Sequence, residues 1–213
     1  QMQALLPAPS PTGTGVLNQG TDGVDTIGSV GPLTVAPGLG GRDVYQFNRG
    51  DGVMVIGDTD LDDWNWDSDG PFPNGDIIEF GPGITAADVE LRLVPNDLEA
   101  YFFWRENSIE IGIKGTDDVI RVHCFSPYWY YYGAGDDPSH RTTAIDEIRF
   151  ADGSVMNLDA IFAALQLGTD GNDRIRPWFD NAIIDGGPGN DLLSPGDNGS
   201  LFDNVSFRFG RDS

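Results

Sequence analysis

The sequence predicts an all-β protein, in which parallel β-roll blocks at both ends flank a β-rich central domain with one short helix. Nine-residue phrases recur near both ends, with glycines early in many phrases, aspartate at every second sixth place and an apolar residue at the eighth place. The segment between them alternates apolar and polar residues, which is typical of strands. We therefore divide the chain into a linker, an N-terminal block, a β domain and a C-terminal block, at 1–19, 20–46, 47–167 and 168–213.

The first segment, 1–19, is rich in proline, glycine and threonine. It begins without the positively charged stretch that opens a secretory signal peptide. We therefore expect a linker rather than a signal peptide.

The N-terminal block reads GTDGVDTIG, SVGPLTVAP and GLGGRDVYQ from Gly20 onward. Glycine-rich half-phrases turn the chain, and the other half forms a short strand whose apolar residue points inward. Two phrases make one coil, so Asp25 and Asp43 should stack about 4.8 Å apart. Stacked carboxylates repel each other unless a cation lies between them, and calcium accepts six to eight such oxygens. The predicted calcium ligands are Gly20, Asp22, Asp25, Gly38, Gly40 and Asp43.

The central segment contains candidate strands, a capped helical turn at Thr85–Asp88 and an amphipathic helix at Asn157–Leu167, capped by Asn157. We expect the strands to lie at 77–80, 91–93, 101–104, 109–113, 119–122 and 145–150.

An acidic loop within this segment is a further calcium candidate. Its residues fall at places 1, 3, 5 and 12 of an EF-hand-like loop, namely Asn65, Asp67, Asp69 and Asp76. No helices are expected to flank it and two prolines interrupt it, so an acidic solvated loop is the alternative interpretation.

A run of aromatic residues lies at 128–132, and consists of Tyr128, Trp129, Tyr130, Tyr131 and Tyr132. Such rings pack in cores, anchor subunit interfaces or stack on sugars. The sequence leaves these three interpretations open.

The C-terminal block reads GTDGNDRIR, PWFDNAIID, GGPGNDLLS and PGDNGSLFD from Gly168 onward. Aspartate holds every second sixth place, so we expect calcium on one edge of each block. The predicted ligands here are Gly168, Asp170, Asp173, Gly186, Pro188 and Asp191. The opposite edges of the two blocks lack the carboxylate, because the sixth places there are Thr34, Ala182 and Ser200.

These phrases resemble a known family. GGPGNDLLS at 186–194 is a full match to the nonapeptide of the haemolysin-type calcium-binding (RTX) repeats, and the phrases at Gly20, Gly38 and Gly168 are near matches. The central segment resembles the companion haemolysin-type calcium-binding-related domain, most strongly in IRFADGSV at 148–155. The resemblance implies Ca²⁺ as cofactor, bacterial type I export, and folding after release from a calcium-poor cytosol.

Composition excludes several classes of function. The formal net charge of −22 argues against nucleic acid as a partner. No run of eighteen apolar residues exists that could insert into a membrane. His123 and His140 are the only histidines, and the common nucleophile, metalloprotease and phosphate-loop motifs are missing. We therefore expect no enzyme.

The leading hypothesis is a secreted calcium-binding structural module that folds on Ca²⁺ and takes part in extracellular assembly or adhesion, as an adhesin, surface-layer or filament subunit. Its expected partners are copies of itself or neighbouring modules of a larger protein. One alternative is a non-catalytic module of a secreted enzyme. The other is a carbohydrate-binding module that takes a glycan with the aromatic run at 128–132.

Overall fold

The computed structural model describes residues 14–57, 75–95, 107–122, 145–175, 183–193 and 205–208. These residues form short β-strands, one α-helix, α1 (Leu158–Ala164), and one 3₁₀ turn, η2 (Ala86–Asp88). The prediction of an all-β fold with a short helix is confirmed.

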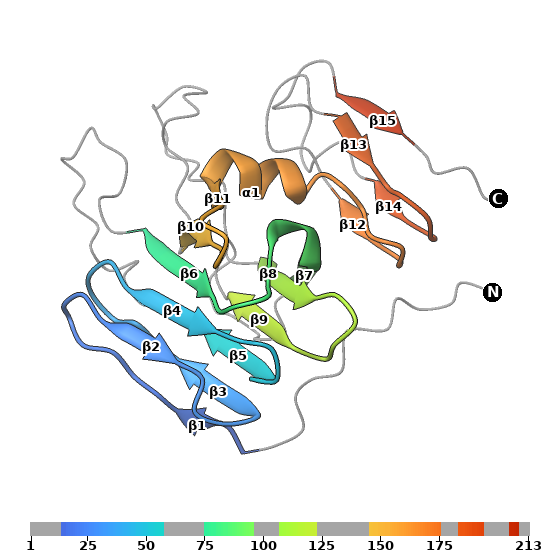
Figure 1. The fold of residues 1–213 in the computed structure, drawn as a ribbon. Helices are drawn as coiled ribbons and strands as arrows, with labels where there is room; N and C mark the ends of the chain where they lie inside the picture. Colours follow the sequence, from blue (N-terminus) through green and yellow to red (C-terminus); the bar gives the residue numbers. More distant parts are fainter. Residues whose placement is uncertain are drawn as a thin grey trace, which may run out of the picture.

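One face of the molecule is a six-stranded sheet (Figure 1). Its order is β1 (Val16–Leu17), β3 (Leu33–Ala36), β5 (Val53–Ile56), β9 (Val119–Val122), β8 (Asn107–Ile113) and β7 (Val89–Pro95). The first four strands run parallel, whereas β7, β8 and β9 pair antiparallel.

The opposite face is a five-stranded sheet in the order β11 (Val155–Asn157), β10 (Ile145–Arg149), β6 (Asp76–Phe80), β4 (Val44–Phe47) and β2 (Thr26–Gly28). Its strands pair in parallel except at β10–β11. The chain therefore alternates between the two sheets from β1 to β6, forms the β7–β8 hairpin, and resumes the alternation at β9 and β10. Strands from 20–46 and from 47–167 share both sheets, and the proposed domain boundaries stay a prediction.

The repeat length is visible in the strand register. Thr26 pairs with Val44, and Val16 pairs with Thr34, so the partners are eighteen residues apart as predicted. Later coils are longer, because loops are inserted between strands: Val44 pairs with Ile77 across an offset of 33 residues. Parallel stacking thus continues even where the nonapeptide frame has ended.

The hydrophobic core fills the space between the two sheets. Alternate residues of each strand point inward, so paired positions of neighbouring strands form continuous rows. Phe47 and Phe80 meet edge to face with ring centroids 6.3 Å apart, and Phe80 stacks on Phe150 at 5.6 Å. The facing row of the other sheet consists of Thr34, Met54, Ile120, Ile111 and Leu91.

The helix α1 closes the end of this core that lies opposite β1 and β2. It contacts β7 from one sheet and β10 and β11 from the other, and it buries Ile161 and Phe162. Asn157 caps it as predicted, with its side-chain oxygen accepting the N–H of Ala160 at 3.0 Å. The helical turn predicted at Thr85–Asp88 is also present, with Asp88 accepting hydrogen bonds from the N–H and hydroxyl of Thr85.

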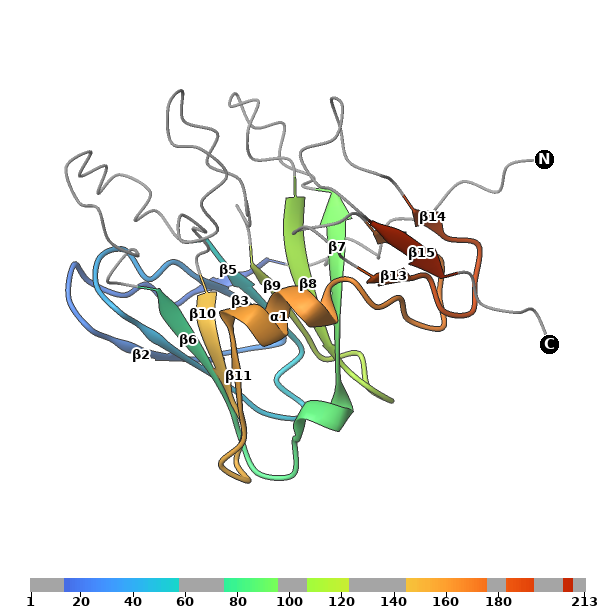
Figure 2. The same ribbon diagram turned by 90° about the horizontal axis from the view of Figure 1, so that it is seen from above.

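A second set of parallel coils follows the helix. In it, β12 (Arg174–Ile175) pairs with β14 (Leu192–Leu193), and β13 (Ile183–Asp185) pairs with β15 (Ser206–Arg208). Arg174 pairs with Leu192, again eighteen residues apart. The strand β12 contacts β7, and Figure 2 shows the C-terminal strands beside β7, on the side of the sheets away from β2.

Candidate calcium sites

The aspartates of the N-terminal block stack from coil to coil. Asp43 Oδ1 accepts the backbone N–H of Asp25 at 2.8 Å. Asp76 Oδ1 accepts the N–H of Asp43 at 2.7 Å, although these residues are 33 positions apart. We call Asp25, Asp43 and Asp76 the N-terminal ladder. The carboxylates of Asp43 and Asp76 each reach back to the aspartate of the preceding coil.

The same contact recurs in the C-terminal block. Asp191 Oδ1 accepts the N–H of Asp173 at 3.1 Å. We call Asp173 and Asp191 the C-terminal ladder. The structure thus brings together both aspartate pairs that the eighteen-residue spacing predicts.

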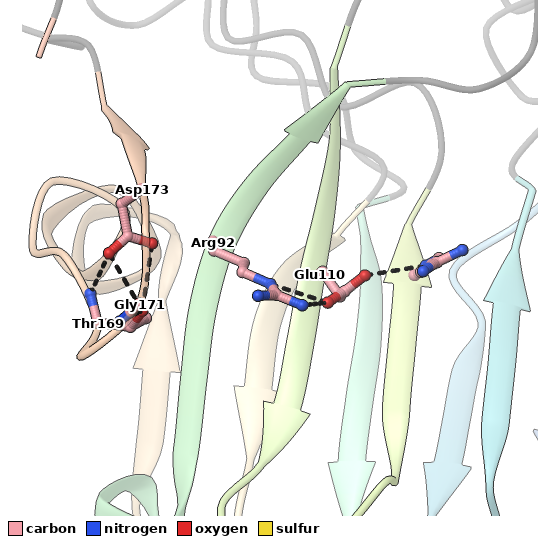
Figure 3. Close-up of polar contacts among 6 residues, drawn as sticks. Arg92, Glu110, Thr169, Gly171 and Asp173 are labelled. Carbon is pink, nitrogen blue, oxygen red and sulfur yellow. Dashed lines mark hydrogen bonds and ion pairs between the residues drawn. The ribbon is translucent and has the colours of Figure 1, made fainter. Parts of the chain in front are cut away.

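A threonine closes the first rung of each ladder. The Asp25 carboxylate accepts the N–H of Thr21 at 2.6 Å and its hydroxyl at 2.7 Å. The Asp173 carboxylate accepts the N–H of Thr169 at 2.7 Å and its hydroxyl at 3.1 Å (Figure 3). Both blocks begin with GTDG, so this local capping follows from a shared phrase.

Backbone carbonyls approach the same edge. A Cβ on Gly168 would overlap the carbonyl oxygen of Gly186, and a Cβ on Gly20 would overlap that of Gly38, so only glycine fits these two places. In the next coil, Asp191 Oδ2 lies where a Cβ on Gly186 would come within 2.6 Å of it. Carboxylate and carbonyl oxygens therefore gather at the first-place glycines of both blocks.

The ladders bury negative charge within the protein. Asp43, Asp76 and Asp173 are only 1%, 2% and 6% exposed, and their ladder contacts come from uncharged N–H groups. Burial raises the pKa of Asp173, while hydrogen bonds from Thr169 act in the opposite direction. A bound cation would remove this penalty.

The donor set fits calcium. Within the described ranges, no group of three or more His, Cys, Asp or Glu side chains could hold a metal. An ion at these edges would combine paired aspartates with backbone carbonyls. Calcium accepts such a mixed and irregular oxygen set, whereas magnesium requires near-ideal octahedral geometry.

The remaining predicted calcium ligands lie in exposed turns, in backbone hydrogen bonds, in the ladder itself or outside the described residues. Asp22, Asp170 and Pro188 lie exposed in the turns, and Gly40 donates its N–H to the Thr21 carbonyl at 3.2 Å. Asp76 begins β6 as a rung of the N-terminal ladder. The remaining loop ligands Asn65, Asp67 and Asp69, and the aromatic run at 128–132, lie outside the described residues.

The edge without carboxylates is built differently. Thr34 is fully buried, and its Oγ1 accepts the N–H of Val30 at 2.9 Å. On the same sheet, Asp118 accepts the N–H groups of Gly50 and Gly52, both at 2.9 Å. Sequence reasoning missed Asp118, although the Gly50-Asp51-Gly52 turn exposes N–H groups that need an acceptor.

A buried charge cluster on the six-stranded sheet was also missed. Glu110 on β8 lies between Arg92 on β7 and Arg121 on β9, with a side chain only 2% exposed. It accepts the Nε–H of Arg92 at 2.8 Å and that of Arg121 at 3.0 Å. Figure 3 shows Arg92 between Glu110 and Asp173, and the charge of Arg92 slightly lowers the pKa of Asp173. The cross-strand register of these three residues was the signal that could have revealed the cluster.

Parts of this chain are similar to known proteins. Residues 109–160, which run from β8 into α1, match the family model of the haemolysin-type calcium binding protein related domain. The iron-regulated protein FrpA of Neisseria meningitidis serogroup C is 31% identical over 147 residues, which cover 68% of this chain and 10% of that protein. The chain thus spans about a tenth of this curated relative's length. No solved structure matches the chain.

The matches confirm the resemblance to haemolysin-type calcium-binding proteins and support a calcium-binding, RTX-like module. They imply Ca²⁺ as the cofactor. Among the residues that the structure describes, no helix has the length and apolar character needed to cross a membrane.

Proposed function

We propose that this chain is a secreted structural module that folds when Ca²⁺ binds at its two aspartate edges, and that it mediates extracellular assembly or adhesion. The observation that carries the proposal is the pair of ladders, in which buried carboxylates stack on successive coils. In the N-terminal block the ion would be held by Asp25, Asp43 and the Gly38 carbonyl. In the C-terminal block it would be held by Asp173, Asp191 and the Gly186 carbonyl.

Charge explains why folding would depend on the ion. The chain carries a formal charge of −22, and this self-repulsion opposes compaction. The ladder carboxylates further destabilise the folded state in the absence of a cation, because like charges are buried beside one another. A site held at ten times its dissociation constant contributes about 1.4 kcal/mol, so two sites contribute about 3 kcal/mol. That is a large share of the stability of a small domain.

Secretion and assembly follow from the same physics. Extracellular calcium is abundant, whereas cytosolic calcium is scarce, so a module of this kind would fold only after export. Short, open parallel coils at the two ends of the described chain also present unpaired strand edges, which favour contact with further strands. A non-catalytic role is consistent with the matched calcium-binding domain.

Differential scanning calorimetry in calcium, in magnesium and in chelator tests the proposal. Calcium is expected to raise the melting temperature by several degrees over the chelated protein, and magnesium to have a much smaller effect. Asp43→Asn should reduce the calcium-induced shift, while Asp152→Asn, in the exposed β10–β11 turn, should leave it unchanged. Identical transitions in all three conditions would contradict the proposal.

A further inference from the structure

The second step of the N-terminal ladder, from Asp43 to Asp76, contains a positively charged side chain. Here the dipeptides Arg42-Asp43 and Gly75-Asp76 of neighbouring coils exchange hydrogen bonds. The Asp76 carboxylate accepts the N–H of Asp43 at 2.7 Å, and the Gly75 carbonyl accepts the Nε–H of Arg42 at 2.9 Å. The guanidinium of Arg42 is therefore bonded to the carbonyl that immediately precedes Asp76.

The place of Arg42 in its phrase is taken by an uncharged residue in the other calcium-edge phrases. Arg42 holds the fifth place, directly before the ladder aspartate, and the other fifth-place residues are Val24, Asn172 and Asn190. In the C-terminal block these residues make a neutral contact, because Asn190 donates its N–H to the Asn172 side chain at 2.9 Å. Arginine stays protonated in proteins, so Arg42 provides a permanent positive charge.

The Arg42 side chain extends away from the first step of the ladder. Gly75 lies directly before β6, and Glu147, whose Oε2 is 3.1 Å from Nη2 of Arg42, lies on β10. In the five-stranded sheet, β4 separates β2 from both β6 and β10. The guanidinium thus reaches from the start of β4 across the second step, whereas the Asp25–Asp43 step lies on the β2 side.

Acidic groups surround this guanidinium. Asp43 and Asp76 are almost fully buried. A Cβ on Gly75 would overlap the Asp146 carboxylate, so that carboxylate packs against the residue whose carbonyl Arg42 contacts. Burying carboxylates beside one another is unfavourable unless a positive charge lies nearby. Arg42 supplies such a charge from within the chain.

We infer that Arg42 takes the place of a calcium ion at the Asp43–Asp76 step, so that the N-terminal ladder holds one ion, between Asp25 and Asp43. The inference rests on the proposed function and sets the number of ions that this ladder binds. A calcium ion at the second step would be repelled by the guanidinium and would compete with it for the Gly75 carbonyl. The charge of Arg42 is present with or without calcium, so the junction of β4 and β6 does not depend on the ion.

Isothermal titration calorimetry of the full chain with calcium tests the inference. Arg42→Met keeps an unbranched side chain and removes the charge. This variant should bind one more calcium ion than the wild type, held by Asp43, Asp76 and the Gly75 carbonyl. Arg42→Gln, which keeps a donor but not the charge, should gain the same ion. Adding Asp76→Asn to either variant should remove the gained ion.

Arg149→Met is the matched control. Both arginines pair with Glu147 and are similarly exposed, with 43% of the Arg42 side chain and 41% of the Arg149 side chain accessible. Within the described chain, only Arg42 bonds to the Gly75 carbonyl. Each variant loses one positive charge and one ion pair, so a general effect of charge on calcium binding is the same in both. Arg149→Met should bind as many ions as the wild type.

The inference is overturned if folded Arg42→Met and Arg42→Gln bind the same number of ions as Arg149→Met. It is also overturned if Asp76→Asn alone removes an ion from the wild-type chain, because calcium would then already occupy the second step. A wild-type chain that binds no calcium would contradict the proposed function itself. The wild-type titration therefore separates the two failures.

Discussion

Replacing Asp191 by asparagine is expected to change the free energy of unfolding in opposite directions with and without calcium. Asparagine keeps the shape of the side chain and an oxygen that can accept the N–H of Asp173, which Asp191 Oδ1 accepts at 3.1 Å. The substitution removes only the charge. In calcium that charge is a ligand, whereas in chelator it repels the carboxylate of the neighbouring rung.

The sizes of the two effects follow from the geometry. Two unit charges about 5 Å apart repel by about 1 kcal/mol when water screens them strongly, and this value applies because Asp191 is partly exposed. Asp191→Asn should therefore stabilise the chelated protein by up to about 1 kcal/mol. In calcium at ten times the dissociation constant, loss of one site costs about 1.4 kcal/mol, and more at higher concentration.

Urea unfolding followed by circular dichroism measures both values. Asp117→Asn is the control, because Asp117 lies exposed in the turn between β8 and β9, away from both ladders, and removes the same unit of net charge. Its effect should have the same sign in both conditions. If Asp191→Asn lowered the unfolding free energy equally in calcium and in chelator, the carboxylate would not be a calcium ligand.

Three further results are expected. Because burial raises the pKa of Asp173, this group stabilises the chelated fold at low pH, and its contribution is lost as pH rises through the folded pKa. The urea midpoint of the wild type in chelator, measured relative to that of Asp173→Asn, should therefore rise as pH falls from neutral; a difference that does not change with pH would count against a buried carboxylate at this position. Glu110→Gln should lower the free energy of unfolding in urea by about 2–4 kcal/mol, because it breaks a buried ion pair. Arg92→Gln should lower it by less, since the Arg92 side chain is 45% exposed. Equal losses for the two variants would show that burial does not determine the energy of this ion pair. Gly41→Ala should lower the free energy of unfolding by about 1–3 kcal/mol more than Gly50→Ala. Both glycines have positive φ, but only a Cβ on Gly41 would come within 2.6 Å of the preceding coil. Melting temperatures that fall equally in the two variants would refute this close approach between Gly41 and the preceding coil.

Local patterns in the sequence predicted much of the fold. The alternation of Ile77, Ile78 and Phe80 predicted β6, and Asn157 predicted the start of α1. The eighteen-residue spacing predicted which aspartates stack, because coil length fixes register wherever the nonapeptide frame holds. These features depend on residues close together in the sequence.

Features that depend on long-range pairing were not visible in the sequence. The offset of 33 residues between Asp43 and Asp76 hid a third rung of the N-terminal ladder. On the basis of local spacing alone, Asp76 was instead assigned to an EF-hand-like loop. The role of Glu110 was missed, because only the pairing of β7, β8 and β9 places it between two arginines.

The central claim is that calcium binding at the aspartate ladders drives folding. Titrating calcium into the chelated chain, held in urea just above its chelated unfolding midpoint and followed by far-UV circular dichroism, tests it most directly. A saturable gain of β signal is expected, with the Asp43→Asn and Asp191→Asn double variant requiring much more calcium to reach it. A chain that stays unfolded in that urea at every calcium concentration would contradict the account.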